Sequence, residues 1–79
     1  MNQEDIELLK KSIDQTVRLL CMDGEIVIAK IDSVDVDDEE IVYEMLHTTN
    51  TSRYEKYDRQ PAYLIRFKDI ERVESTQNR

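Results

Sequence analysis

Several residue types are scarce in this chain, and their scarcity limits what it can be. The 79 residues include one cysteine, one histidine, one glycine, one proline and no tryptophan. The single thiol, Cys21, cannot form an intrachain disulfide, and together with His47 it cannot complete a set of zinc ligands. No apolar run approaches membrane-spanning length, and the polar, acidic start does not resemble a signal peptide. We therefore expect no metal, no cofactor, no membrane association and a cytosolic location.

The short length limits the size of the hydrophobic core. A domain of this size buries only about 60% of the surface that its unfolded chain exposes, so stability is marginal without a staple. We therefore expect one domain, 1–79, that gains buried surface by forming a homo-oligomer. The net charge of −7, from 18 acidic and 11 basic residues, disfavours nonspecific binding to nucleic acid or to anionic membranes. A local basic patch is still compatible with this balance.

A helix is predicted over about residues 3–14. Asn2 can cap its start, and Ile6, Leu9 and Ile13 recur at intervals of three and four residues, which gives one apolar face. A helix this short is not stable alone in water. It must therefore pack on the remainder of the chain.

The remainder of the chain follows a period of two, which indicates β-strands. Asp23-Gly24 is a tight-turn dipeptide between apolar runs, and it uses the only glycine. The hydrophobic phase changes near Ala29, which predicts a bend in the second strand. The pattern predicts a mainly β fold, a small, strongly bent, five-stranded antiparallel barrel with an N-terminal helix. The strands are expected at about 16–22, 25–36, 40–48, 62–68 and 70–74.

Short motifs in this order resemble those of the Sm/LSm family of small SH3-like β-barrels. Val17-Arg18-Leu19-Leu20, followed by Asp23-Gly24, resembles the family's first strand and turn. Ala29-Lys30-Ile31 and Ser33-Val34-Asp35 lie where the family has Gly-Lys-Leu and Gly, an apolar residue and Asp. Ile65-Arg66-Phe67-Lys68-Asp69-Ile70 resembles the family's Ile-Arg-Gly-x-Asn-Ile.

The resemblance implies a ring in which the fourth strand of one subunit pairs with the fifth strand of the next. Such pairing would leave no exposed sheet edge. The large apolar residues of these two strands would then form the subunit interface. They are Tyr63, Ile65, Phe67, Ile70 and Val73.

The resemblance also implies binding of uridine- or adenine-rich single-stranded RNA around the pore. Phe67 replaces the family's glycine, however, and Glu39 or Glu40 replaces an asparagine in the preceding turn. A bulky side chain hinders close backbone approach, and acidic groups repel phosphate. The residues that the resemblance assigns to RNA are Asp35, Arg66, Lys68 and Asp69, the last in place of an asparagine.

The polar segment 48–61 is a candidate interaction loop. It interleaves basic residues with tyrosines, a composition typical of protein interfaces and of single-strand stacking surfaces. Glu55 and Asp58 dilute its charge, which favours a protein contact over RNA. The candidate contact residues are Arg53, Tyr54, Lys56, Tyr57 and Arg59.

The acidic stretch 32–44 is expected to be a solvated face, because it lacks the turn glycine and ligand spacing of a calcium loop. Nothing in the sequence supplies a nucleophile or a catalytic cleft, so we expect no enzymatic activity. The leading interpretation is a non-catalytic, self-assembling, Sm-like binding or scaffold module. The alternatives are an RNA-binding ring of the Sm/LSm type and a monomeric SH3-like adaptor for another protein.

Overall fold

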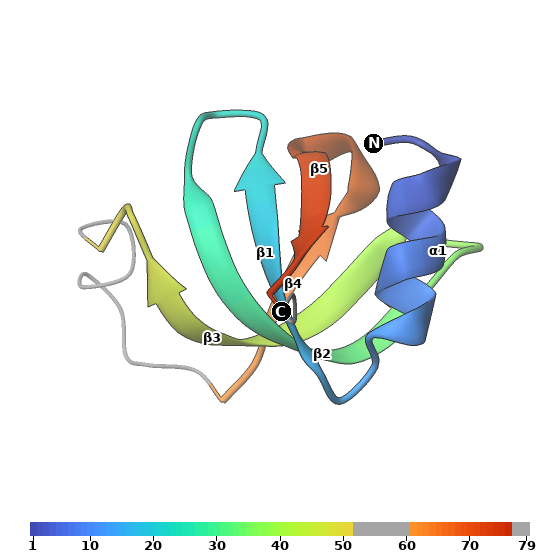
Figure 1. Ribbon diagram of the computed structural model, residues 1–79, viewed down its shortest axis with the longest axis horizontal. Coiled ribbons are helices and arrows are strands. Elements are labelled where there is room, and N and C mark those ends of the chain that lie inside the picture. Colours follow the sequence, from blue (N-terminus) through green and yellow to red (C-terminus); the bar gives the residue numbers. More distant parts are fainter. Residues whose placement is uncertain (52–60, 77–79) are drawn as a thin grey trace.

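The computed structural model describes residues 1–51 and 61–76, which form a bent sheet with a helix at one end (Figure 1). A short 3-10 turn at Phe67–Asp69, labelled η1, connects the last two strands. No helix among the described residues is long and apolar enough to cross a membrane. The elements are α1 (Gln3–Lys11), β1 (Thr16–Cys21), β2 (Ile26–Asp35), β3 (Glu40–Thr48), β4 (Tyr63–Arg66), η1 (Phe67–Asp69) and β5 (Ile70–Ser75).

Helix α1 begins with a capping box. The backbone N–H of Asp5 donates to Asn2 Oδ1 at 2.9 Å, and the backbone N–H of Asn2 donates to Asp5 Oδ2 at 3.0 Å. These bonds satisfy donors that the first turn would otherwise leave unpaired. Acidic residues in the first turn and lysines in the last turn complement the helix dipole.

The helix ends at Lys11, so the predicted extension to residue 14 is wrong. The hydroxyl of Ser12 donates to the carbonyl of Leu8 at 2.7 Å, and the N–H of Ser12 donates to the carbonyl of Leu9. Asp14 then adopts a left-handed backbone conformation with φ 68°, which reverses the chain into β1. Ile13 consequently lies outside the helix and is exposed.

The five strands form one sheet in the order β4-β3-β2-β1-β5, and every pair is antiparallel. The β2–β3 register shifts between Ile28 and Ala29 and again between Ile31 and Ser33. These irregularities coincide with the strong curvature of both strands in Figure 1. The structure thus confirms the mainly β, strongly bent sheet and the bend near Ala29. The order leaves β4 and β5 as the two edge strands.

The fourth strand is shorter than predicted, because the chain leaves the sheet at Phe67 to form η1. The N–H of Phe67 donates to the carbonyl of Glu39 at 2.8 Å, which holds η1 against the turn between β2 and β3. The side chain of Phe67 points into the core. The expected strand over 62–68 therefore becomes a strand of four residues followed by a turn.

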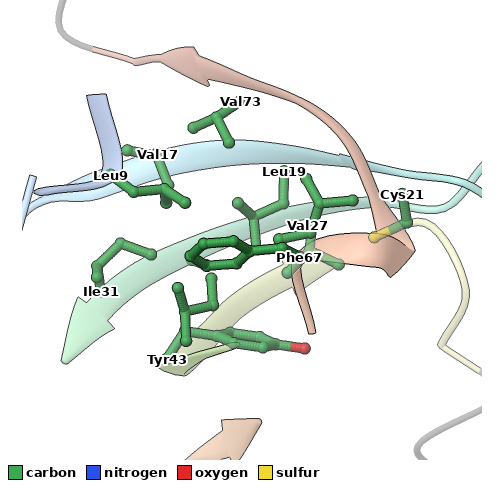
Figure 2. Packing of buried hydrophobic residues seen from close by; sticks show 12 residues of the cluster. Leu9, Val17, Leu19, Cys21, Val27, Ile31, Tyr43, Phe67 and Val73 are labelled. Carbon is green, nitrogen blue, oxygen red and sulfur yellow. The ribbon is translucent and has the colours of Figure 1, made fainter. Parts of the chain in front are cut away.

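One hydrophobic core lies inside the curve of the sheet and is closed by α1 (Figure 2). It draws on the helix, on β1, β2, β3 and β5, and on η1, so each element buries its apolar face against the others. Burying each large side chain contributes about 1.5–3 kcal/mol. The buried apolar residues are Leu9, Val17, Leu19, Cys21, Val27, Ala29, Ile31, Ile41, Tyr43, Phe67, Ile70 and Val73.

Candidate functional site

The structure brings two of the residues that the family resemblance assigns to RNA to one end of the sheet. Asp35 at the end of β2 lies opposite Glu40 in β3, and Glu40 lies opposite Arg66 in β4. Asp35 and Arg66 are therefore in one row, with a carboxylate between them. Asp35 is itself engaged locally, because its Oδ1 accepts the N–H of Asp38 at 3.0 Å. Asp35 thus shapes the acidic turn between β2 and β3, residues 36–39.

The turn η1 carries Lys68 and Asp69, and both are exposed. The carbonyl of Asp69 accepts the N–H of Met22 at 2.9 Å, which ties η1 to the β1–β2 hairpin. On the other side of η1, the N–H of Phe67 donates to the carbonyl of Glu39. The turn η1 therefore lies between the β1–β2 turn and the β2–β3 turn, both of which are distant from it in sequence. Its position, and so that of Arg66 beside it, is fixed from both sides.

A cavity of about 500 Å³ lies between β4, η1 and the β1–β2 hairpin. Its lining combines apolar, basic and acidic side chains. The sequence analysis identified its basic members, Arg66 and Lys68, but missed Met22 and Leu64. Both are exposed apolar residues, and no pattern in the sequence marks them as exposed. The lining includes Met22, Asp23, Leu64, Arg66, Lys68 and Asp69.

The predicted interface residues divide into two groups. Tyr63 and Ile65 in β4 are half-buried and pack against the rim of the core. Phe67, Ile70 and Val73 are buried in the protomer itself. That their strand positions also adjoin another subunit stays a prediction. The three side chains fill the protomer core because η1 and β5 turn their apolar faces inward.

Leu64 is the large apolar side chain of β4 that faces outward. It is 54% exposed, and it lies opposite Val42 on the convex face of the sheet. Strand alternation places it on the opposite face from its neighbours Tyr63 and Ile65. An exposed leucine in an edge strand is a candidate contact for another chain.

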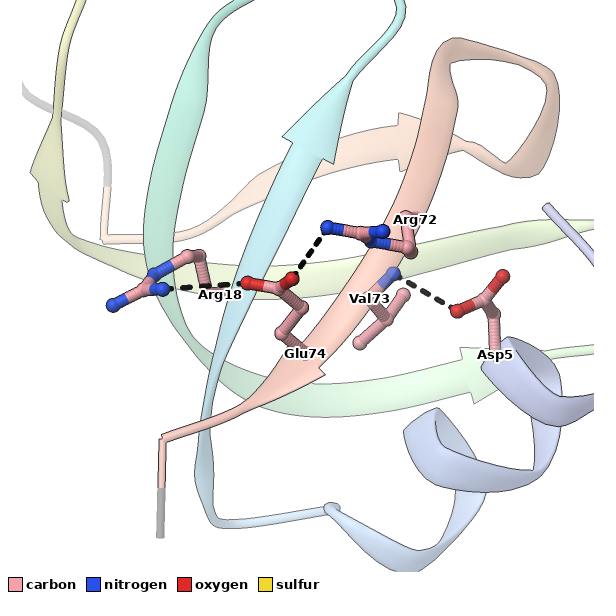
Figure 3. Close-up of polar contacts among 5 residues, drawn as sticks. All are labelled: Asp5, Arg18, Arg72, Val73 and Glu74. Atoms are coloured by element: carbon pink, nitrogen blue, oxygen red, sulfur yellow. Dashed lines mark hydrogen bonds and ion pairs between the residues drawn. The ribbon is translucent and has the colours of Figure 1, made fainter. Parts of the chain in front are cut away.

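The other edge strand, β5, has side chains in ion pairs and a backbone N–H that is hydrogen-bonded to a side chain of α1 (Figure 3). Arg18 and Arg72 both form ion pairs with Glu74, at 3.3 and 2.6 Å. Such exposed pairs stabilise by at most about 1 kcal/mol. The N–H of Val73 donates to Asp5 Oδ1 at 3.0 Å. Helix α1 thus reaches the edge of the sheet.

On the outer face of the sheet, the carboxyl group of Glu44 in β3 lies within hydrogen-bond reach of Asp32 in β2. A hydrogen bond with Asp32, and then its negative charge, raise the pKa of Glu44, while Lys30 opposes the shift. A raised carboxyl pKa favours folding at low pH, and that contribution is lost as pH rises through the folded-state pKa. This pair belongs to the sheet face and not to the cavity.

The β1–β2 hairpin brings the Cys21 thiol and the carboxylates of Asp23 and Glu25 within 4.8 Å of one another. Both carboxylates also make structural hydrogen bonds, one within the hairpin and one to β3. Asp23 accepts the N–H of Glu25 at 3.0 Å, and Glu25 accepts the hydroxyl of Thr48. We therefore assign these carboxylates to the structure of the hairpin and of its contact with β3.

The candidate contact residues of the segment 48–61 lie outside the described residues. They are Arg53, Tyr54, Lys56, Tyr57 and Arg59.

Comparison with known proteins identifies the fold. No family model matches the sequence, and no curated protein matches it. Among solved structures, the chain is similar to the SmAP (LSm) protein of Methanococcus vannielii, with a TM-score of 0.67 and 19% identity. The similarity covers 92% of this chain and 96% of that one. The fold is therefore that of the Sm/LSm small barrels, as the sequence motifs predicted.

Proposed function

We propose that this chain is a non-catalytic, self-assembling scaffold in which β4 of one copy pairs with β5 of the next. The observation that carries the proposal is that β4 and β5 are the two ends of the sheet, with Leu64 exposed on β4. An edge strand offers backbone N–H and C=O groups to another strand. In β5 one of these groups, the N–H of Val73, is bonded to Asp5. The Sm-type fold and the family resemblance in sequence support the same pairing.

The composition of β4 also supports assembly. Its four residues have the sequence Tyr63-Leu64-Ile65-Arg66, in which three are large and apolar. Natural edge strands that avoid pairing usually carry charges or proline in their interior. Here the charge is at the end of the strand, at Arg66, and not in its middle. A small domain also gains buried surface when copies associate.

We predict that the purified protein has a solution mass of several subunits. The measurement is size-exclusion chromatography with light scattering over a concentration series. A mass that falls toward one subunit only on dilution supports reversible assembly. A protomer mass at every concentration contradicts the proposal and favours a monomeric SH3-like adaptor instead.

A second candidate function is binding of single-stranded RNA, because the cavity beside β4 has two basic side chains, Arg66 and Lys68, on its wall. Guanidinium groups stack on bases and pair with phosphates. Two acidic residues, Asp23 and Asp69, share the same wall and offset this charge. The cytosolic location expected from the sequence stays a prediction under either function.

For the RNA function, we predict that Arg66→Ala weakens binding of a short uridine- or adenine-rich strand by about 1–3 kcal/mol, roughly 5- to 150-fold. Fluorescence anisotropy at fixed salt measures this affinity. Arg72→Ala is the matched control, since Arg72 is an exposed arginine on β5 outside the cavity. Equal losses in both variants would indicate nonspecific charge attraction, and no binding by the parent protein would exclude this function.

A further inference from the structure

The two edge strands of the sheet carry opposite charges. The charged residue of β4 is Arg66, which is exposed at the end of the strand. The charged residues of β5 are Glu71, Arg72 and Glu74, so this strand has one acidic residue in excess. In a head-to-tail contact between copies, different surfaces of two subunits meet, and opposite charges on those surfaces attract each other. The charges of β4 and β5 therefore suit such a contact.

Arg66 and Glu71 form no ion pair with any of the described residues. Arg66 lies opposite Glu40 in the β3–β4 ladder, but no ion pair joins these two side chains. On β5, by contrast, Arg72 is paired with Glu74 at 2.6 Å. The described part of the protomer thus leaves one basic side chain on the β4 edge and one acidic side chain on the β5 edge for a second copy.

Glu71 is the extra residue of a β-bulge. In the β1–β5 ladder, Leu20 lies opposite Arg72 and Cys21 lies opposite Ile70, so Glu71 has no counterpart in β1. Glu71 and Arg72 are both exposed, although neighbours in a regular strand alternate between the two faces of the sheet. The bulge therefore presents two successive side chains of the edge strand to solvent.

The lengths of the strands limit which part of β5 Arg66 can meet in a second copy. In an antiparallel pair between copies, like every pair within the sheet, the end of β4 lies beside the start of β5. When all four residues of β4 pair with the six of β5, Arg66 lies opposite one of residues 70–72. Ile70 faces the core of its own protomer, so the exposed Arg66 matches the bulge positions, Glu71 and Arg72. Side chains at opposed or diagonal positions of a ladder are within reach of each other.

We propose that Arg66 on β4 of one copy forms an ion pair with Glu71 on β5 of the next copy. The pair favours one register of the two strands, because a shift along β5 separates the two charges. It also makes the contact directional, since two β4 edges would oppose arginine to arginine. This inference rests on the proposed function, because the partner that supplies Glu71 is a second copy of this chain.

A double-mutant cycle on the full chain tests the pair. The measurement is the apparent dissociation constant of self-association, from sedimentation velocity over a concentration series. Arg66→Gln and Glu71→Gln should each raise that constant about threefold to tenfold, the scale of a close charge pair at an interface. The double variant should be no weaker than either single variant, because both substitutions remove the same interaction.

Lys68→Gln is the matched control. Lys68 is an exposed base on the same cavity wall as Arg66, but it belongs to η1 and not to β4. The effects of Lys68→Gln and Glu71→Gln should therefore multiply in the double variant, as independent changes do. The three side chains are exposed, so each variant should keep the circular dichroism of the parent protein.

The outcomes separate the ion pair from assembly itself. Coupling of Glu71→Gln to Arg66→Gln, and not to Lys68→Gln, supports the pair. A parent protein that assembles while Arg66→Gln and Glu71→Gln act independently overturns the ion pair alone. Equal coupling of Glu71→Gln to both basic positions also overturns it, because that result would reflect general attraction between the two edges. A parent protein that stays a protomer at every concentration overturns the assembly and the pair together.

Discussion

Replacing Phe67 with glycine, the residue that the resembled family carries here, should bring the protein close to unfolding and should not open a nucleic-acid site. The ring is 7% exposed and lies among core side chains from β1, β2 and β3 (Figure 2). Removing a buried aromatic side chain costs about 3–5 kcal/mol, and glycine adds backbone freedom to the unfolded state. Domains of this size have little more stability than that.

Urea unfolding followed by circular dichroism measures this loss as a lower midpoint. Lys68→Gly is the matched control, because Lys68 is the exposed neighbour in the same turn and its replacement tests the backbone effect alone, at about 0.5–1 kcal/mol. Phe67→Leu keeps an apolar side chain and should lose less than Phe67→Gly. If Phe67→Gly is no less stable than Lys68→Gly, the ring does not hold the turn in place.

Phe67 also explains why this barrel departs from the family motif. The family's glycine lets the backbone approach a ligand closely, whereas here the same position supplies a large part of the core. The exposed groups of the turn, Lys68 and Asp69, are then one base and one acid. The turn therefore has a structural role, and any binding must use Arg66 and the cavity wall beside it.

Local patterns predicted those parts of the fold that depend on neighbours in sequence. Gly24 has φ 94° in the β1–β2 turn, a conformation that glycine adopts without strain. Asn2 caps the helix, and the change of hydrophobic phase near Ala29 marks a real shift in register. The turn, the cap and the change of hydrophobic phase each involve residues within a few positions of one another, so composition and spacing are sufficient to find them.

The sequence could not predict features that depend on contacts between distant residues. Ile13 fits the helical period, but the chain reverses at Asp14 because Asp14 and Gln15 pair with the backbone of Ile31. In the amino-acid sequence, the apolar residues of an edge strand show the same pattern whether their side chains fill the core or form an interface. Only the arrangement of η1 and β5 shows that Phe67 and Val73 face inward. The Asp5–Val73 bond joins residues 68 positions apart.

The exposed side chain of β4 offers the most direct test of assembly. Leu64→Glu should convert the oligomer to protomers without unfolding them. The side chain is 54% exposed in the protomer, so its replacement should change protomer stability by no more than about 0.5 kcal/mol. At a β4–β5 junction, by contrast, the new carboxylate would be buried without a partner. An unpaired buried charge costs several kcal/mol, which corresponds to at least a 100-fold weaker association.

Leu46→Glu is the matched control, because it makes the same change at a leucine of β3 that is 59% exposed and lies beyond the residues that pair with β4. Both variants add one negative charge to an already acidic protein, so general repulsion between copies is the same in each. Light scattering should therefore show protomers for Leu64→Glu and parent-like mass for Leu46→Glu. Oligomers of parent mass in both variants would place the contact away from β4. Dissociation of both would mean that net charge, and not the β4 edge, limits association.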